Sequence, residues 1–274
     1  MQKDVTYRRV TPKSMLNKGT GFLAGYSHSL NPYAGCVYGC SYCYVRKLPV
    51  AVLRGEEWGT WVDIKEGAAA VLRKELRREK AKGPVTIFMS SSTDPYQPLE
   101  YKEQITRSLL EVMAEDPPDF LLLQTRSPLV RRDIDLLRKL GSRVRVSMTI
   151  ETDLEEVRQA FTPLSPPIAA RLETLRLLKN EGIPVQAAIA PILPSSERFA
   201  EILLPVANRI CIDDFWMGDG SGGVRTQSLE LERVYRELGY SEWYDPSAWK
   251  IVYERFKKVF GEDRVFISAQ GFAP

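Results

Sequence analysis

The sequence contains a single histidine, His28, among its 274 residues. Most acid–base and metallohydrolase mechanisms rely on histidine as a proton carrier or a metal ligand. A Ser-His-Asp triad or an HExxH zinc site therefore cannot be assembled anywhere else in the chain. This scarcity removes the common hydrolytic mechanisms from consideration.

Long apolar runs and a strong charge bias are also absent. No stretch reaches the roughly 18 consecutive apolar residues of a membrane span, and the opening MQKDVTYRRVTPK lacks an apolar signal core. We therefore expect a cytoplasmic protein with no membrane partner. The net charge of +3 is far from that of a dedicated nucleic-acid binder. A basic cluster within 73–82 is interleaved with Glu75 and Glu79, which favours a solvated helix face.

Only four cysteines are present, but three of them share one short loop. Cys36, Cys40 and Cys43 are spaced C-x3-C-x2-C within NPYAGCVYGCSYCYVRKLP. A [4Fe-4S] cluster takes a soft thiolate on each iron. Three thiolates therefore leave the fourth iron free to bind something that reacts.

Zinc and disulfides are the alternatives for such a loop. A structural zinc site usually has two separated ligand pairs, and only Cys211 and His28 remain as further ligands. A chain of 274 residues can bury its own core without a disulfide framework. The spacing therefore favours an iron–sulfur cluster over both.

Hydrophobic periodicity predicts alternating strands and helices from residue 20 onward. Such a series calls for an α/β fold with a parallel sheet and right-handed crossovers. Its simplest closure is a partial (β/α)6 TIM-type barrel with a C-terminal helical extension. The predicted strands cover 26–33, 85–89, 120–123, 144–150, 185–192 and 209–215, with a final strand at 265–268. The main predicted helices cover 63–81, 101–115, 134–140, 153–160, 165–182 with Ser165 as its cap, and 196–204.

Three regions follow from this pattern. They are an N-terminal extension at 1–25, the barrel at 26–216, and a C-terminal extension at 217–274 that packs on the barrel.

Polar residues without a helical role collect after the predicted strands. The βα loops of a parallel barrel converge at the carboxyl ends of its strands, so these residues should share one rim. Turn formation and helix capping are the alternative roles for such residue types. We expect Asp94 to order its loop, and we place Asp213, Asp214 and the glycine loop 218–223 on the substrate side.

The combination of NPYAGC-x3-C-x2-CY with STDPYQP, TRSPLVRRDIDLL, SMTIET and IAPILP resembles the radical S-adenosylmethionine (SAM) superfamily. It is most similar to the spore photoproduct lyase-like, or DNA repair photolyase-like, branch, and the resemblance covers about residues 26–210. It implies a [4Fe-4S] cluster and SAM as cofactors. It also implies reductive cleavage of SAM to a 5'-deoxyadenosyl radical that abstracts a hydrogen atom.

The resemblance assigns roles to individual residues. It makes Cys36, Cys40 and Cys43 the metal ligands and Tyr44 a catalytic residue for hydrogen or radical transfer. The residues that would contact SAM are Tyr42, Thr93, Arg126 and Ser147. The lyase uses a cysteine as its hydrogen-atom donor, and Ser91 stands at that place here. A serine O–H bond is too strong for that role, which puts repair by the lyase route in doubt, and Cys211 is the only spare thiol.

Three functions remain open at this point. The first is a lyase-like radical SAM enzyme acting on a nucleic acid. The second is a radical SAM enzyme that modifies a peptide, a protein or a small metabolite. The third is a non-enzymatic iron–sulfur protein for electron transfer. Either enzyme would need a reducing electron donor such as flavodoxin or ferredoxin.

Overall fold

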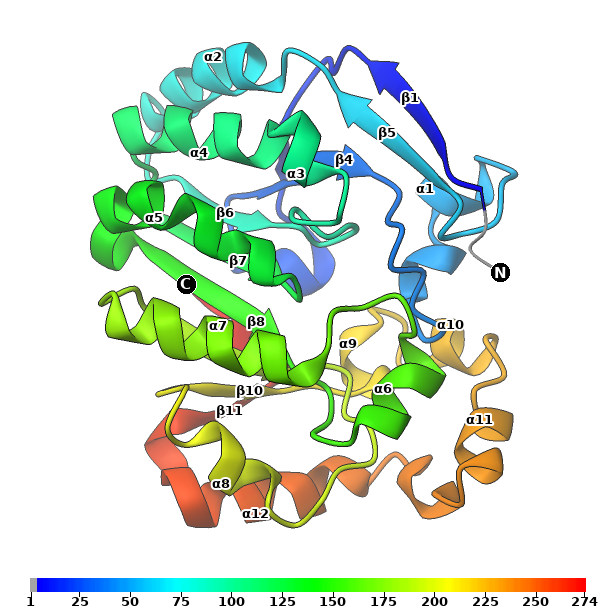
Figure 1. The fold of residues 1–274 in the computed structure, drawn as a ribbon. Helices are drawn as coiled ribbons and strands as arrows, with labels where there is room; N and C mark the ends of the chain where they lie inside the picture. The colour runs from blue at the N-terminus through cyan, green and yellow to red at the C-terminus, as the bar shows by residue number, and fades with distance from the viewer. Residues whose placement is uncertain (1–3) are drawn as a thin grey trace.

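One eight-stranded sheet organises the chain, and the computed structural model describes residues 4–274 (Figure 1). The sheet runs in the order β11-β10-β9-β8-β7-β6-β3-β2. Neighbours from β11 to β3 are parallel, and β2 at the edge is antiparallel. The strands are β2 Leu16–Lys18, β3 His28–Leu30, β6 Thr86–Met89, β7 Phe120–Thr125, β8 Val144–Thr149, β9 Val185–Ile189, β10 Ile210–Ile212 and β11 Val265–Ile267.

This sheet confirms the predicted α/β fold and partial barrel. Within the described residues it stays open, with β11 and β2 as its two edges. The strand predicted at 265–268 is present and pairs in parallel with β10. The division into three regions stays a prediction, and residues 1–3 of the first region lie outside the described residues. None of the helices between residues 4 and 274 combines the length and apolarity that a membrane crossing needs.

The outer face of the sheet is covered by helices. Side chains such as Ile87, Leu121 and Val146 pack in one core cluster with the apolar sides of α2, α4, α5, α7, α8 and α12. The helices are α1 Pro49–Val52, α2 Ala68–Lys80, α3 Glu100–Glu103, α4 Ile105–Glu115, α5 Ile134–Leu140, α6 Glu155–Phe161, α7 Ile168–Asn180, α8 Phe199–Leu203, α9 Phe215–Gly218, α10 Val224–Gln227, α11 Glu232–Glu237, α12 Ala248–Phe260 and α13 Ser268–Phe272.

The inner face of the sheet is filled from the C-terminus. Phe88, Leu122 and Cys211 alternate with the outward residues of their strands and form a separate apolar cluster with Phe272 of α13. The hydroxyl of Tyr26 donates a hydrogen bond to the carbonyl of Phe272. The last helix therefore closes the interior below the carboxyl ends of the strands.

A second sheet stands beside the barrel, in the order β1-β5-β4. Its strands are β1 Thr6–Val10, β4 Tyr33–Ala34 and β5 Trp61–Lys65. The prediction of a helix from residue 63 was wrong, because 63–65 belong to β5. Gly67 has a left-handed backbone (φ 74°) and separates β5 from α2, so Ile64 matches the helical spacing of α2 only by coincidence.

Two helices differ from the prediction in detail. The segment predicted as one helix at 101–115 is divided into α3 and α4 at Gln104, whose φ is 51°. Ser165 does not cap α7, because its hydroxyl has no hydrogen-bond partner and the N-cap is Pro167. The free backbone N–H of Ile168 instead donates to Glu155 Oε2 at 3.3 Å.

Candidate functional site

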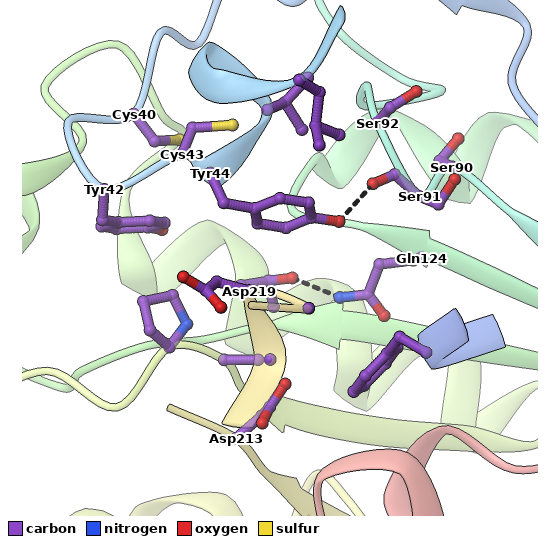
Figure 2. A pocket seen from close by; sticks show the side chains of 18 of the residues that line it. Cys40, Tyr42, Cys43, Tyr44, Ser90, Ser91, Ser92, Gln124, Asp213 and Asp219 are labelled. Carbon is purple, nitrogen blue, oxygen red and sulfur yellow. Dashed lines mark hydrogen bonds between the residues drawn. The ribbon is translucent and has the colours of Figure 1, made fainter. Parts of the chain in front are cut away.

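A cavity of about 540 Å³ opens at the carboxyl ends of the parallel strands. The cysteine loop forms one side of it, and the residues that follow β6, β7 and β10 form the others. Figure 2 shows Cys40 and Cys43 on one side, Ser90–Ser92 and Gln124 on another, and Asp213 and Asp219 on a third. The rim that the strand pattern predicted is therefore a real cavity. Of the predicted site residues, only Ser147 is missing from its lining.

Glycines fix the path of the cysteine loop. Gly35 has a φ of 84°, and a Cβ at this position would lie 2.3 Å from the carbonyl oxygen of Trp61. Gly39 has a φ of 55°, and its Cα packs against Gly59. The guanidinium of Arg46 donates to the carbonyls of Cys40 at 3.1 Å and Gly39 at 2.6 Å. The chain can therefore fold into a tight arc that brings Cys36, Cys40 and Cys43 to one cavity.

The three thiols fit a cationic iron–sulfur centre. They are free cysteines that line the same cavity. Burial raises the pKa of Cys36 well above its usual value, and Asp94 and Cys40 raise it further. Burial likewise raises the pKa of Cys43 to about 12, with Cys40 adding to the rise. Buried thiolates that repel one another become stable when metal cations are bound between them.

No three His, Cys, Asp or Glu side chains of residues 4–274 are arranged around a single metal ion. The thiolates of a cubane bind three different irons, so they need not converge on one point.

A buried carboxylate links the cysteine loop to the barrel rim. Glu151 Oε1 accepts from Arg126 Nη1 at 2.6 Å and also from the hydroxyl of Tyr42. Glu151 Oε2 accepts from Arg171 Nη1 at 2.7 Å. Burial alone would raise the pKa of Glu151, but Arg126 and Arg171 outweigh it and lower the pKa to about 2. The only sign of this network in the sequence is the glutamate of SMTIET, which follows a predicted strand.

Asp94 orders the neighbouring loops, as the sequence analysis expected. Its Oδ1 accepts from the backbone N–H of Tyr96 at 2.9 Å and from the hydroxyl of Thr125 at 2.7 Å. Its Oδ2 accepts from the backbone N–H of Arg126 at 2.9 Å. These bonds join the loop after β6 to the loop after β7. They leave the carboxylate with structural partners on both oxygens.

Thr93 and Ser147 have structural partners. Thr93 Oγ1 donates to the carbonyl of Gly35 at 2.5 Å, which ties the loop after β6 to the cysteine loop. Ser147 is fully buried on β8, and its hydroxyl accepts from Gln186 Nε2 at 2.8 Å. Thr149, two residues further along β8, does line the cavity. The role of Ser147 as a SAM contact stays a prediction.

Polar atoms without hydrogen-bond partners lie on the side of the cavity formed by the ends of β6 and β7. Ser90 is buried and has a positive φ of 78°, a strained backbone of the kind that gathers at functional sites. Its hydroxyl has no hydrogen-bond partner, nor has Gln124 Oε1, while Gln124 Nε2 donates to Thr149 Oγ1 at 2.6 Å. Phe88 and Phe272 supply the apolar floor beside them. A bound molecule could therefore use both polar and aromatic contacts here.

Asp213, Asp214 and Asp219 form an acidic wall. Burial raises the pKa of Asp213 to about 7, and Asp214 adds to the rise. Asp214 Oδ1 caps α9 by accepting from two backbone N–H groups at 2.8 Å, whereas its Oδ2 has no partner. Only a glycine fits at position 218, since a Cβ would lie 2.1 Å from Asp213 Oδ2. Cys211 lies below this wall, fully buried and outside the cavity lining, as expected for a small core residue.

Tyr44 reaches across the cavity toward Ser91. Its hydroxyl donates to the carbonyl of Ser91 at 2.8 Å (Figure 2). The hydroxyl of Ser91 accepts from Asn31 Nδ2 at 3.3 Å. Both residues line the cavity, so the place of the lyase's donor cysteine faces the predicted catalytic tyrosine.

Comparisons with known proteins identify a matching family profile, similar sequences and similar structures. The family profile described as "Radical SAM superfamily" matches residues 30–203. The chain is 34% identical over 172 residues to an uncharacterized protein of Methanocaldococcus jannaschii, covering 63% of this chain and 62% of that protein. It is 29% identical over 212 residues to an uncharacterized protein of Mycobacterium tuberculosis, covering 74% of this chain and 62% of that one. The chain thus spans less than two thirds of the length of these relatives.

Among solved structures, the chain is similar to a spore photoproduct lyase mutant with bound AdoMet and dinucleoside spore photoproduct. The TM-score is 0.65 with 14% sequence identity, over 96% of this chain and 82% of that one. At such low identity the likeness shows the fold alone.

Replacing Glu151 by Gln should lower the free energy of unfolding by about 3–5 kcal/mol, because Arg126 and Arg171 would keep buried charges without a carboxylate. Urea denaturation measures the loss. A lowered pKa means that the stabilisation is complete above about pH 4.5 and is lost as the pH falls toward 2. Glu173→Gln, in an exposed ion pair with Arg176, is the control and should cost less than about 1 kcal/mol. Equal losses in the two variants would contradict the role of the buried network.

Replacing Asp213 by Asn should stabilise the protein increasingly as the pH rises to 7. Because the folded pKa of Asp213 is raised to about 7, the folded state holds a proton that the unfolded chain has released above about pH 4. As the pH rises from about 4 to 7, the free energy of unfolding therefore falls by up to about 1.4 kcal/mol per pH unit because of this group. Above pH 7 this contribution no longer changes. Urea denaturation across this range compares the variant with the native protein. The exposed control Asp263→Asn should show no such trend, and a parallel trend in both would refute the assignment.

Proposed function

The chain belongs to the radical SAM superfamily, and we propose that it abstracts a hydrogen atom from a substrate bound in the cavity at the carboxyl ends of the strands. Members of the superfamily use a [4Fe-4S] cluster and SAM, and these are the cofactors of this protein. When bound, they supply a 5'-deoxyadenosyl radical by one-electron cleavage of SAM. The chain itself contributes ligands, orientation and exclusion of water.

One observation carries the proposal: the three free thiols line the same cavity as the polar groups that lack hydrogen-bond partners. Cys36, Cys40 and Cys43 would hold the cluster, each through its own iron. Ser90 and Gln124 lie on another side, where a substrate could satisfy their open hydrogen-bonding capacity. A site for electron entry and a site for a reacting molecule would thus lie in one cavity.

SAM would bind beside the cysteine loop. Tyr42, Thr93, Arg126 and Ser147 are the residues we assign to it, and Thr149 is the β8 side chain that lines the cavity. Glu151 holds Tyr42 and Arg126 in fixed positions, so an adenine ring or a carboxylate would meet preorganised partners. Arg126 is the only one of the four with a positive charge that can attract a carboxylate.

Tyr44 is the residue we assign to hydrogen transfer. Its ring lies between the cysteine side and the loop that carries Ser91. A phenolic O–H can give a hydrogen atom to a carbon radical far more easily than a serine hydroxyl can. Tyr44 would therefore take over, in whole or in part, the step for which the lyase uses its cysteine.

Two substrate classes follow from different observations. The lyase-like fold favours a nucleic-acid lesion, because the similar lyase structure holds a dinucleoside spore photoproduct. The acidic wall favours the second class, a peptide, a protein or a small metabolite, since carboxylates repel a phosphate backbone. The first remains the leading proposal, on the strength of the likeness over 96% of the chain.

Anaerobically reconstituted protein should convert SAM to 5'-deoxyadenosine and methionine when dithionite is added. Cys40→Ala should abolish both the brown cluster absorbance and this product, because only two thiolates would remain in the loop. Cys211→Ala is the matched control and should keep both, since Cys211 lies outside the cavity lining. A fully loaded native cluster that yields no 5'-deoxyadenosine would instead support a non-enzymatic electron-transfer protein.

Replacing Ser91 by Cys should create or increase conversion of dinucleoside spore photoproduct, because a thiol would then face the substrate side of Tyr44. Liquid chromatography of the repaired dinucleotide measures it. Ser92→Cys is the control, since Ser92 also lines the cavity but is one residue away from the lyase's donor position. No conversion by either variant, with SAM cleavage intact, would favour the second substrate class.

A further inference from the structure

An exposed apolar turn follows the cysteine loop directly. Val50, Val52 and Leu53, on and just after α1, are 38%, 61% and 85% exposed. Apolar side chains that gather in one short surface segment are typical of an interaction site. Residues 46–54, which include this turn and the cations before and after it, are called the donor face below.

The opposite side of the same turn belongs to the cavity. Ala51 is buried in the apolar cluster that contains Cys36 and Cys40, and Leu48 packs against that cluster and lines the cavity. A helix with its side chains is about 10–12 Å across. A partner seated on Leu53 would therefore be separated from the cysteine loop by a single layer of protein.

Residues 46–54 contain three cations and no carboxylate, but two of these cations already have partners. Arg54 is held by Glu56 and Asp63, at 2.8 and 3.0 Å. Arg46 is bound to carbonyls of the cysteine loop, whereas Lys47 is exposed at the edge of the apolar patch. Glu57 adds one negative charge beyond the end of the donor face. An acidic partner would thus meet the exposed Lys47 beside the cysteine loop.

We propose that the donor face docks the one-electron carrier protein that reduces the cluster, a carrier with an acidic rim and an apolar centre such as a flavodoxin. The inference rests on the proposed function, in which an external reductant is needed. One electron leaves the reduced carrier and enters the cluster, and no bond or proton moves in that step. The cavity must hold SAM and substrate away from water, so the electron enters through the outer side of α1.

An acidic electron carrier fits this face better than a nucleic acid or a second copy of this chain does. A nucleic acid would be attracted by Lys47, but it would leave Val52 and Leu53 in water. A second copy of this chain would place the same cations of both copies close together. An acidic carrier with an apolar centre could cover Val52 and Leu53 and place a carboxylate beside Lys47.

The test uses the holoenzyme with reduced flavodoxin. Leu53→Asp and Lys47→Glu should each weaken flavodoxin binding about tenfold or more in calorimetry, because each places a negative charge where the partner is acidic. SAM cleavage driven by flavodoxin should fall with the binding, while cleavage driven by dithionite should match the native protein. Ile251→Asp, which alters an apolar side chain of α12 with 66% exposure, is the control and should bind as the native protein does.

Several results would overturn the proposal. Unchanged flavodoxin affinity in both variants would show that the carrier docks elsewhere. A change of oligomeric state in Leu53→Asp would show that a second copy covers the face. Loss of cluster absorbance or of dithionite-driven cleavage would show a structural role instead. Failure of native protein to cleave SAM with dithionite would reject the proposed function, whereas flavodoxin binding measured separately would still decide the docking face.

Discussion

The position of Glu151 between Arg126 and Arg171 is the constraint on which the site depends. The carboxylate follows β8, Arg126 follows β7, and Arg171 comes from α7, so three separate segments meet at one buried charge. Arg126 and Arg171 together carry one more charge than Glu151 can neutralise. In the low dielectric of the interior, this excess positive charge interacts strongly with nearby groups. The Tyr42 hydroxyl joins the same carboxylate. The cysteine loop is thereby positioned by the barrel and not only by its own turns.

The open barrel leaves the space in which the cavity lies. On the inner face of the sheet, Phe88 and Cys211 pack against the C-terminal helix α13. Beyond them, toward the carboxyl ends of the strands, many of the residues that line the cavity are polar. An apolar floor with polar sides is the usual character of a ligand cavity. The level at which the filling stops is set by Phe272, so the last residues of the chain determine the depth of the cavity.

Much of the fold was predictable, because strands buried in a parallel sheet leave short apolar runs bounded by turn residues. The error at 63–65 arose because β5 pairs with β1 and β4 in a separate sheet, and Ile64 happened to continue the spacing of α2. The cysteines were predictable because their ligand spacing is local. The partnership of Glu151 with Arg171 was not, since it depends on how α7 packs over β8. Thr149 lines the cavity and Ser147 does not, because Thr149 lies closer to the carboxyl end of β8. Residue spacing in the sequence does not show which of the two reaches the cavity.

The arrangement of charges separates the cysteines from the substrate region. Arg46 lies at the carbonyls of the cysteine loop and Arg126 is bonded to Tyr42, with the Glu151 carboxylate between Arg126 and Arg171. Asp213, Asp214 and Asp219 line another wall, which within the described residues carries no cation partner of this kind. A positive surrounding stabilises the extra electron of a reduced centre and makes reduction easier. On the far wall Asp213 is held near its point of titration, so it can be neutral or charged at physiological pH. Reduction and substrate binding are thereby given different electrostatic environments within one cavity, with Tyr44 reaching between them.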